Sequence, residues 1–541
     1  MRSQFVSKIR AYLICLAILA TLFMALQNGG RASVHTPFQN NLTPQEKRGR
    51  QIYMQGTSSS GREILAYLGD ASLEVPGSAM PCSNCHGLNG EGKPEGGVIP
   101  TNLTWEYLTK PYGVTHPSGR KHPPYTERAL ELALTRGLDP AGNKLMNVMP
   151  RYQMSREDMA DLIAYLKRLG LDRDPGVADD HLTIGILIPV RGDLAGIGQA
   201  VKAVTTAFFD EVNSQGGIYN RRVELKFVET AATPAATSAN VKSFIQDEHI
   251  FAMTSAFTAG ADKEIAALMA ELEVPLVGPL TLFPQVGHPL NRQVFYLLSG
   301  IDEQSRALVN FASQKFPDKK AGALIVHPEG ELAAGAVGAI KDQCQKNSCG
   351  SLETFSYRRA DFNAPALARE LSQKSKNVVF FLGKGDEALA LMREADKLRW
   401  SPLLYLPGAA IGKEMFDAPL SFNQKIFLSF PTSPAAQTAE GIESFRALAA
   451  KYKLPADHPA TQLSAYSAAK ILVEGLKRVG KEVSREKLIA VLEGLYEYGT
   501  GLMPAVTYGP NRRIGAMGAY VVTIDLEKKQ FAPVSSWVKT N

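Results

Sequence analysis

The sequence predicts a multi-domain protein in which a small all-α domain is followed by a two-lobed α/β domain. Three observations support this fold class. The chain has 541 residues, whereas a single hydrophobic core stops growing at roughly 250 to 300 residues. A charged segment containing Pro175 and Gly176, residues 171–181, is typical of a linker between two cores. After it, apolar runs of strand length alternate with amphipathic helices, which indicates a parallel sheet covered on both faces.

The N-terminus has the layout of a secretory signal peptide. Basic residues precede an uninterrupted apolar run, Ala11 to Leu26, and small and polar residues follow it. We place the signal peptide at residues 1–32 and expect the mature protein to be exported to the periplasm. An uncleaved membrane anchor is the alternative, because the run is only a little short of the roughly 20 residues that a span needs.

The motif Cys82-Ser83-Asn84-Cys85-His86 carries the strongest functional signal. Two cysteines two residues apart, followed at once by a histidine, are the attachment signature of a c-type haem. Both thiols form thioethers with the porphyrin, and the imidazole of His86 binds the iron. A zinc site would need further ligands at fixed spacing, and a thioredoxin-like motif would open a helix after a strand. We expect one covalently attached haem c.

The second axial ligand of the iron is expected downstream of this motif. Met149 is followed by Pro150, which favours an extended backbone at Met149 and suits a ligand presented from a loop. Met146 and Met154 are the competing methionines. Ser155 then caps a predicted helix whose apolar residues recur at helical spacing and form one face.

Residues 41–170 resemble the class I cytochrome c family, in which two terminal helices, the CxxCH loop and a Met-Pro loop enclose one haem. The resemblance implies that His86 and Met149 are the axial iron ligands and that the domain carries electrons. Two departures stand out: an insertion from Gly56 to Met80, and a polar stretch from Lys110 to Pro124. The latter contains His116 and His122. Either could replace the methionine as ligand, but we expect both to be exposed loop residues.

Two cysteines remain after the signal peptide and the haem motif. Cys344 and Cys349 lie close enough in sequence to close a small loop, and in an oxidising compartment they should form a disulfide. A pair of buried free thiols is the alternative. Their polar neighbours favour the disulfide, because they are typical of a surface segment.

Residues 182–541 are expected to form the two-lobed α/β domain. The predicted strands are Leu182–Val190, Val223–Val228, His249–Met253, Pro275–Gly278, Ala323–His327, Val378–Leu382, Leu403–Leu406 and Ile426–Phe430. Long helices are expected at Ala439–Tyr452 and Ala460–Val479, with closing strands near Ala519–Ile524. Ligands of such folds bind outside the carboxyl ends of parallel strands, so a ligand is expected between the lobes.

The element Asn213-Ser214-Gln215-Gly216-Gly217-Ile218, after the strand and helix that open this domain, resembles the type I periplasmic binding proteins of the branched-chain amino acid and amide group. The resemblance implies ligand contacts from Ser255, Thr258 and Thr281. Leu282 stands where that family often has a hydroxyl. Helix capping is the alternative role for Ser255 and Thr258. In the second lobe Lys384 is a candidate for an anionic ligand, and a solvated turn is its alternative.

Together the two resemblances imply an exported protein that transfers electrons through its haem and uses its second domain to bind a small molecule or to dock a redox partner. The expected redox partner is a periplasmic cytochrome or dehydrogenase. The alternative is a substrate-binding or sensory receptor, with a membrane transporter or sensor as partner and the haem as a redox reporter. The chain lacks the common catalytic motifs, so we expect no enzyme; a haem peroxidase would need an open iron position. The net charge of +6 is spread without long basic blocks, so a nucleic-acid partner is not expected.

Overall fold

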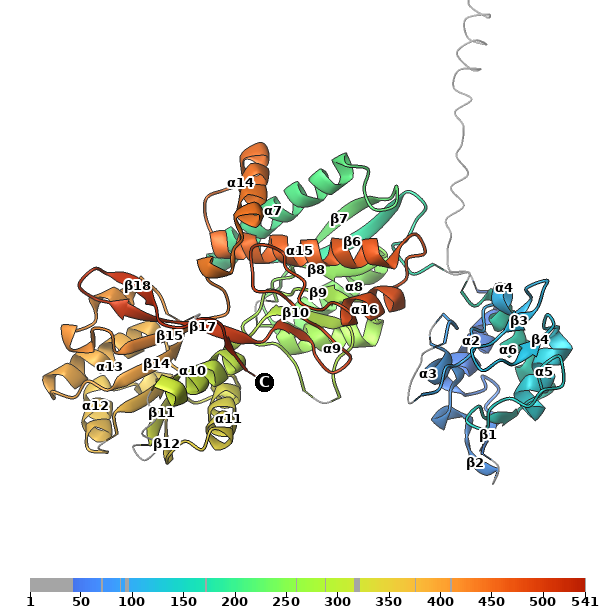
Figure 1. Cartoon of the computed structure of the whole chain (residues 1–541), viewed down its shortest axis with the longest axis horizontal. Coiled ribbons are helices and arrows are strands. Elements are labelled where there is room, and N and C mark those ends of the chain that lie inside the picture. The colour runs from blue at the N-terminus through green and yellow to red at the C-terminus, as the bar shows by residue number, and fades with distance from the viewer. Residues whose placement is uncertain are drawn as a thin grey trace, which may run out of the picture. The chain divides into compact units, whose positions relative to one another are not determined.

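The computed structural model describes residues 42–69, 72–87, 89–92, 97–170, 173–258, 260–287, 289–315, 322–374, 376–408 and 411–540. The predicted signal peptide lies outside this range. The chain divides into two compact units, Met1–Asp172 and Arg173–Asn541. They appear blue to cyan and green to red in Figure 1, and each is described by itself. Among the described residues, no helix combines the length and apolar character that a membrane span requires.

The first unit is built mainly from helices. Its elements are α2 (Pro44–Gln55), β1 (Leu65–Leu68), β2 (Leu73–Pro76), η1 (Gly77–Ala79), α3 (Cys82–His86), α4 (Trp105–Leu108), β3 (Val114–Thr115), β4 (Lys121–His122), α5 (Glu127–Arg136), β5 (Arg151–Gln153) and α6 (Arg156–Arg168). Helix α2 begins with a capping box between Thr43 and Glu46. The hydroxyl of Ser155 caps α6 by accepting a hydrogen bond of 3.0 Å from the backbone N–H of Asp158.

Helices α2 and α6 cross closely because Gly49 lies at the contact. A Cβ atom on Gly49 would lie 1.9 Å from the carbonyl oxygen of Asp161 and 2.8 Å from Cβ of Tyr165. The guanidinium of Arg48 donates two hydrogen bonds of 2.6 and 2.9 Å to the carboxylate of Asp161. A residue without a side chain and a bidentate ion pair therefore fix this crossing.

The insertion from Gly56 to Met80 forms a β-hairpin, which the sequence did not predict. Strand β1 pairs antiparallel with β2 on one side and with β5 on the other, giving the order β2-β1-β5. A second short hairpin joins β3 and β4. The helical prediction for this domain is confirmed, and the structure adds two small sheets. The insertion lies directly against the segment that follows Met149 and Pro150.

The first lobe of the second unit is a six-stranded parallel sheet of order β16-β10-β9-β8-β6-β7. Its elements are β6 (His181–Ile188), η2 (Gly192–Leu194), α7 (Ala195–Ser214), β7 (Arg222–Glu229), α8 (Pro234–Asp247), β8 (Ala252–Thr254), α9 (Asp262–Leu272), β9 (Leu276–Val277), β10 (Val294–Leu298), α14 (Ala439–Tyr452), α15 (Pro459–Val479), α16 (Arg485–Glu493) and β16 (Ile514–Ala516). One buried cluster joins the sheet to α7, α15 and α16, and another joins it to α8 and α9. Helices thus cover both faces, as predicted.

The second lobe is an eight-stranded mixed sheet of order β12-β11-β13-β14-β15-β17-β18, with β19 paired to β17. Its elements are α10 (Ile301–Lys315), β11 (Ala323–Pro328), α11 (Glu331–Lys346), β12 (Leu352–Tyr357), η3 (Arg359–Asp361), α12 (Ala364–Ser372), β13 (Val378–Phe381), α13 (Gly385–Lys397), β14 (Leu403–Pro407), η5 (Lys413–Asp417), η6 (Leu420–Phe422), β15 (Ile426–Phe430), η7 (Pro434–Ala436), β17 (Gly518–Asp525), β18 (Gln530–Pro533) and β19 (Val538–Lys539). Strands β11 to β15 run parallel to one another, whereas β17 runs antiparallel to β15.

The chain passes between the lobes after β10, after β15 and after β16 (Figure 1). The predicted linker, residues 171–181, is less exposed than expected over its described part. The carboxylate of Asp174 accepts a hydrogen bond of 2.5 Å from the backbone N–H of Arg485, and Gly176 packs against the backbone of His249 and Phe251. Residues 174–178 therefore belong to the packed edge of the first lobe.

Candidate functional site

Cys82, Cys85 and His86 all lie on the single helical turn of α3. His86 is buried, and its Nδ1 atom lies 2.9 Å from the carbonyl oxygen of Thr101. Because a carbonyl oxygen only accepts, Nδ1 carries the proton and donates, which leaves the lone pair of Nε2 for a metal. Burial lowers the pKa of His86 and so favours the neutral imidazole that binds iron.

The two cysteines of the motif are free thiols three residues apart on this turn. Residues three apart on a helix share a face, so both sulfurs are available to one planar group. Cys82 is half-buried against the hydrophobic core of the unit, whereas Cys85 is exposed. The phenol of Tyr53 holds the end of the turn by donating a hydrogen bond of 2.7 Å to the carbonyl oxygen of Gly87. These residues fit a covalently attached haem c.

Met149 and its competitors differ in burial. Met149 is half-buried and packs against the same hydrophobic core as Cys82. Met146 is 59% exposed, so the structure favours Met149 over it. Met154 is half-buried and packs against this core as well. The assignment of Met149 as axial ligand stays a prediction.

His116 and His122 are buried, so the expectation that they are exposed loop residues was wrong. They lie on and beside the β3–β4 hairpin with their Nε2 atoms 2.9 Å apart. Arg120 lies 2.9 Å from Nε2 of His116 and forms a 2.7 Å ion pair with the buried carboxylate of Asp139. The hydrogen bonds of this cluster explain the burial, because they satisfy polar groups that the sequence pattern suggested were solvated.

The hydroxyls predicted to contact a ligand in the first lobe have protein partners. Ser255, at the carboxyl end of β8, is fully buried and donates a hydrogen bond of 2.9 Å to the carbonyl oxygen of Ala465 on α15. Thr258 is buried and donates to the carboxylate of Asp262, which opens α9. Thr281 accepts a hydrogen bond of 2.8 Å from the backbone N–H of Phe283. Their contact with a ligand stays a prediction.

In the second lobe Lys384 is exposed at the N-terminus of α13. Its backbone N–H donates a hydrogen bond of 2.7 Å to Oε2 of Glu387, and the phenol of Tyr357 donates one of 2.8 Å to the same oxygen. Tyr357 ends β12, and Glu387 lies just beyond β13. This contact was not predicted from the sequence, because Tyr357 and Glu387 lie 30 residues apart. Their position near the carboxyl ends of β12 and β13 is where ligands of such folds bind.

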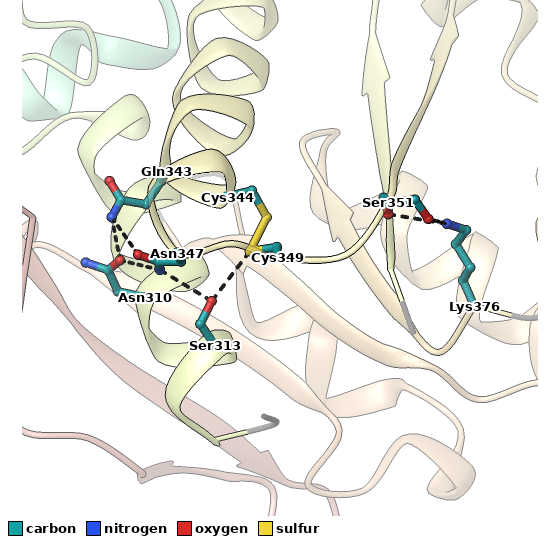
Figure 2. Close-up of a disulfide and its surroundings, with 8 residues drawn as sticks. All are labelled: Asn310, Ser313, Gln343, Cys344, Asn347, Cys349, Ser351 and Lys376. Atoms are coloured by element: carbon teal, nitrogen blue, oxygen red, sulfur yellow. Dashed lines mark hydrogen bonds between the residues drawn. A yellow bond between two sulfur atoms is a disulfide. The ribbon is translucent and has the colours of Figure 1, made fainter. Parts of the chain in front are cut away.

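Cys344 and Cys349 form a disulfide in the second lobe with a Cα–Cα distance of 5.0 Å. It closes the turn between α11 and β12, as Figure 2 shows. Amide side chains bind this turn to α10: Gln343 and Asn347 donate hydrogen bonds of 2.6 and 2.9 Å to the side-chain oxygen of Asn310. The pairing predicted from the sequence is thus present in the structure.

Comparison with known proteins identifies both units. The family model "Periplasmic binding protein" matches residues 181–530, and the model "Cytochrome c" matches residues 47–170. The chain is 24% identical over 316 residues to "Leu/Ile/Val-binding protein homolog 3" of Brucella melitensis, covering 58% of this chain and 83% of the relative. It is 25% identical over 340 residues to a Leu/Ile/Val-binding protein of Rhizobium johnstonii, covering 62% and 89%.

Two solved structures from ABC transporter systems share the fold of the second unit. One is a branched-chain amino acid ABC transporter protein from Thermus thermophilus with bound valine, with 14% identity and a TM-score of 0.54 over 67% of this chain and 97% of that chain. The other is a fatty acid ABC transporter substrate-binding protein from Thermomonospora curvata, with 15% identity and a TM-score of 0.53 over 68% and 95%. The chain belongs to the periplasmic binding protein family and carries a cytochrome c domain ahead of its two-lobed binding domain.

Proposed function

We propose that this protein is an exported electron carrier whose binding domain couples the carrier to a small molecule. Cys82 and Cys85 would hold one haem c, and His86 and Met149 would ligate its iron. The group supplies a one-electron couple between ferrous and ferric iron. The observation that carries the proposal is the hydrogen bond from Nδ1 of His86 to Thr101, because it orients Nε2 as a ligand. A periplasmic cytochrome or dehydrogenase would be the redox partner.

The binding domain is proposed to take a small carboxylate-bearing molecule, with an amino acid as the first candidate. This part of the proposal is supported by the names of the relatives, which are Leu/Ile/Val-binding proteins, and by the valine in the Thermus thermophilus structure. Because the hydroxyls of Ser255, Thr258 and Thr281 are engaged with protein, backbone N–H groups at the strand ends would supply much of the contact. Lys384 would add a positive charge from the second lobe.

Expression with a cytochrome maturation system tests the carrier. The mature protein should be heavier than its polypeptide by one haem and should show the α-band of a low-spin haem c when reduced. Met149→Ala should alter that band and lower the reduction potential, while the matched control Met146→Ala should leave both unchanged because Met146 is 59% exposed. A colourless protein of polypeptide mass would refute the carrier.

A second candidate function is a transport-type or sensory receptor, favoured by the Leu/Ile/Val-binding relatives. Calorimetry against amino acids, amides and short acids, with the haem first oxidised and then reduced, separates the two. An affinity that differs between the oxidation states supports coupling between binding and electron transfer. Tight binding with the same affinity in both states supports the receptor, with a membrane transporter or sensor as partner.

A further inference from the structure

Arg151 stands out in the cytochrome c domain because its guanidinium is used on backbone carbonyls. Arg151 opens β5 and is half-buried. It donates hydrogen bonds to the carbonyl oxygen of Met149 and, at 3.2 Å, to that of Leu145. One side chain thereby closes the loop that ends in Met149.

The loop of residues 137–149 begins at Gly137, whose missing side chain leaves room for the guanidinium of Arg151. Gly137 ends α5 with φ +66, and a Cβ atom there would lie 1.9 Å from Nε of Arg151. The backbone N–H of Leu145 donates a hydrogen bond of 2.8 Å to the carbonyl oxygen of Gly137. The guanidinium is therefore seated between the beginning of the loop and its end.

Arg151 has no carboxylate within ion-pair distance among the described residues, and its charge is solvated by carbonyl oxygens instead. Within the same domain Arg120 is by contrast neutralised, because its guanidinium pairs with the carboxylate of Asp139 at 2.7 Å. A guanidinium stays protonated at any working pH. The Met149 loop therefore contains a fixed positive charge.

The inserted hairpin fixes the backbone that carries Arg151. Strand β1 pairs with β5, with Tyr67 opposite Arg151 and Ala66 opposite Tyr152. At the hairpin tip the backbone N–H of Gly69 donates a hydrogen bond of 3.3 Å to the carbonyl oxygen of Asn147, inside the loop. The insertion thus holds the loop at two places.

We propose that Arg151 is a positioning residue for the axial methionine: on strand β5, which pairs with the inserted hairpin, it holds the carbonyl oxygens of Met149 and Leu145 and so fixes the position of the Met149 side chain. The inference rests on the proposed role of Met149 as iron ligand. Both the positioning and the fixed charge raise the reduction potential. A firmly held methionine ligand favours ferrous iron, and a nearby cation disfavours ferric relative to ferrous iron. Arg151 therefore raises the reduction potential of the domain.

The test uses the full-length holoprotein and the variants Arg151→Gln, Arg151→Lys, Lys144→Gln and Met149→Ala. Lys144 is an exposed cation in the same loop, so Lys144→Gln removes a charge without removing the carbonyl contacts. Arg151→Lys keeps the charge but cannot present the planar fork of donors. The readouts are haem mass, reduction potential, imidazole affinity of the ferric protein and amide hydrogen exchange of residues 137–149.

Arg151→Gln should lower the reduction potential and increase amide hydrogen exchange in the loop, because strong charge-assisted hydrogen bonds are lost. Imidazole competes with Met149 for the ferric iron, so a loosened Met149 should tighten imidazole binding by about tenfold or more. Arg151→Lys should loosen the loop in the same way but lower the potential less. Lys144→Gln should match the wild type, because Lys144 is exposed and solvent screens its charge. If Met149→Ala alters the spectrum while Arg151→Gln matches the wild type in every readout, the positioning role is refuted and the ligand assignment stands. If Met149→Ala leaves the spectrum unchanged, the ligand assignment fails and the inference fails with it.

Discussion

The hydroxyl of Ser299 donates a hydrogen bond of 2.6 Å to the carbonyl oxygen of Gly518, and Ser299 is buried. Ser299 follows β10 in the first lobe, and Gly518 opens β17 in the second. The bond therefore joins two of the segments through which the chain passes between the lobes. If the two lobes close around a ligand, the connecting segments would have to bend beside this hydrogen bond.

Ser299→Ala should lower the free energy of unfolding of the binding domain by about 1–3 kcal/mol, because it leaves the carbonyl oxygen of Gly518 buried without a partner. Denaturant unfolding followed by far-UV circular dichroism measures this. The matched control is Ser214→Ala, since the hydroxyl of Ser214 bonds the carbonyl oxygen of Glu211 on an exposed helix end. That change should stay within about 0.5 kcal/mol. Equal effects of the two substitutions would contradict a special role for the Ser299 bond.

Gly49→Ala should destabilise the cytochrome c domain even though alanine is the better helix former by about 1 kcal/mol. The added Cβ would lie 1.9 Å from the carbonyl oxygen of Asp161, so α2 and α6 must separate, at a cost of about 1–3 kcal/mol. Thermal unfolding monitored by haem absorbance gives the sign. Arg50→Ala, an exposed position on the same helix, is the control and should change the midpoint little. A higher midpoint for Gly49→Ala would show that the helices do not cross at Gly49.

The sequence predicted elements whose signal is local and failed where pairing joins distant residues. Helices α14 and α15 were predicted to within a residue because their apolar faces repeat at helical spacing. The β1–β2 hairpin was missed because its strands have four residues each, are mostly only half-buried or exposed, and gain their register from β5, far along the chain. Strands β10, β12 and β16 were missed as well.

The candidate site shows the same division. The haem motif is contiguous in sequence, so predicting a haem attachment site there needed no tertiary information. By contrast, the burial of His116 depends on Arg120, and Arg120 depends in turn on Asp139 from the segment after α5. Likewise, Arg151 packs against Gly137 and bonds the carbonyl oxygen of Leu145 only when the loop between residues 137 and 149 folds back on itself. His116 and His122 were predicted to be exposed because the carboxylate of Asp139, which completes their cluster through Arg120, is not a neighbour in sequence.

The His116 cluster should make the cytochrome c domain sensitive to acid. Burial, together with the charges of Arg120 and His122, lowers the pKa of His116 from 6.5 to about 4, although Asp139 opposes the shift. The unfolded chain therefore takes up a proton at a higher pH than the folded domain does. The stability contributed by neutral His116 is complete above pH 6.5 and is lost as the pH falls from 6.5 through about 4.

Unfolding of the domain at a series of pH values, followed by haem absorbance, measures this loss. His116→Gln should flatten the dependence between pH 6.5 and 4, because glutamine cannot take up the proton. His458→Gln, which changes an exposed histidine at the start of α15 in the other unit, should leave it unchanged. A slope in the His116→Gln variant equal to that of the wild type would assign the acid sensitivity to other groups.

The disulfide between Cys344 and Cys349 should contribute about 2 kcal/mol to the stability of the binding domain, the amount expected from closing a short loop in the unfolded chain. Cys344 is buried and Cys349 half-buried, so replacing both with alanine keeps the site apolar. The double variant should lose this stability, and reduction of the wild type should produce the same loss. Reduction should not change the double variant further, which is the control.

Thiol titration of the unfolded mature holoprotein gives an independent check, since thioether formation would consume Cys82 and Cys85: no thiol should react before reduction, and only Cys344 and Cys349 should react after it. Reactive thiols at these two positions before reduction would contradict the disulfide, whereas reactive thiols at Cys82 and Cys85 would contradict the attached haem.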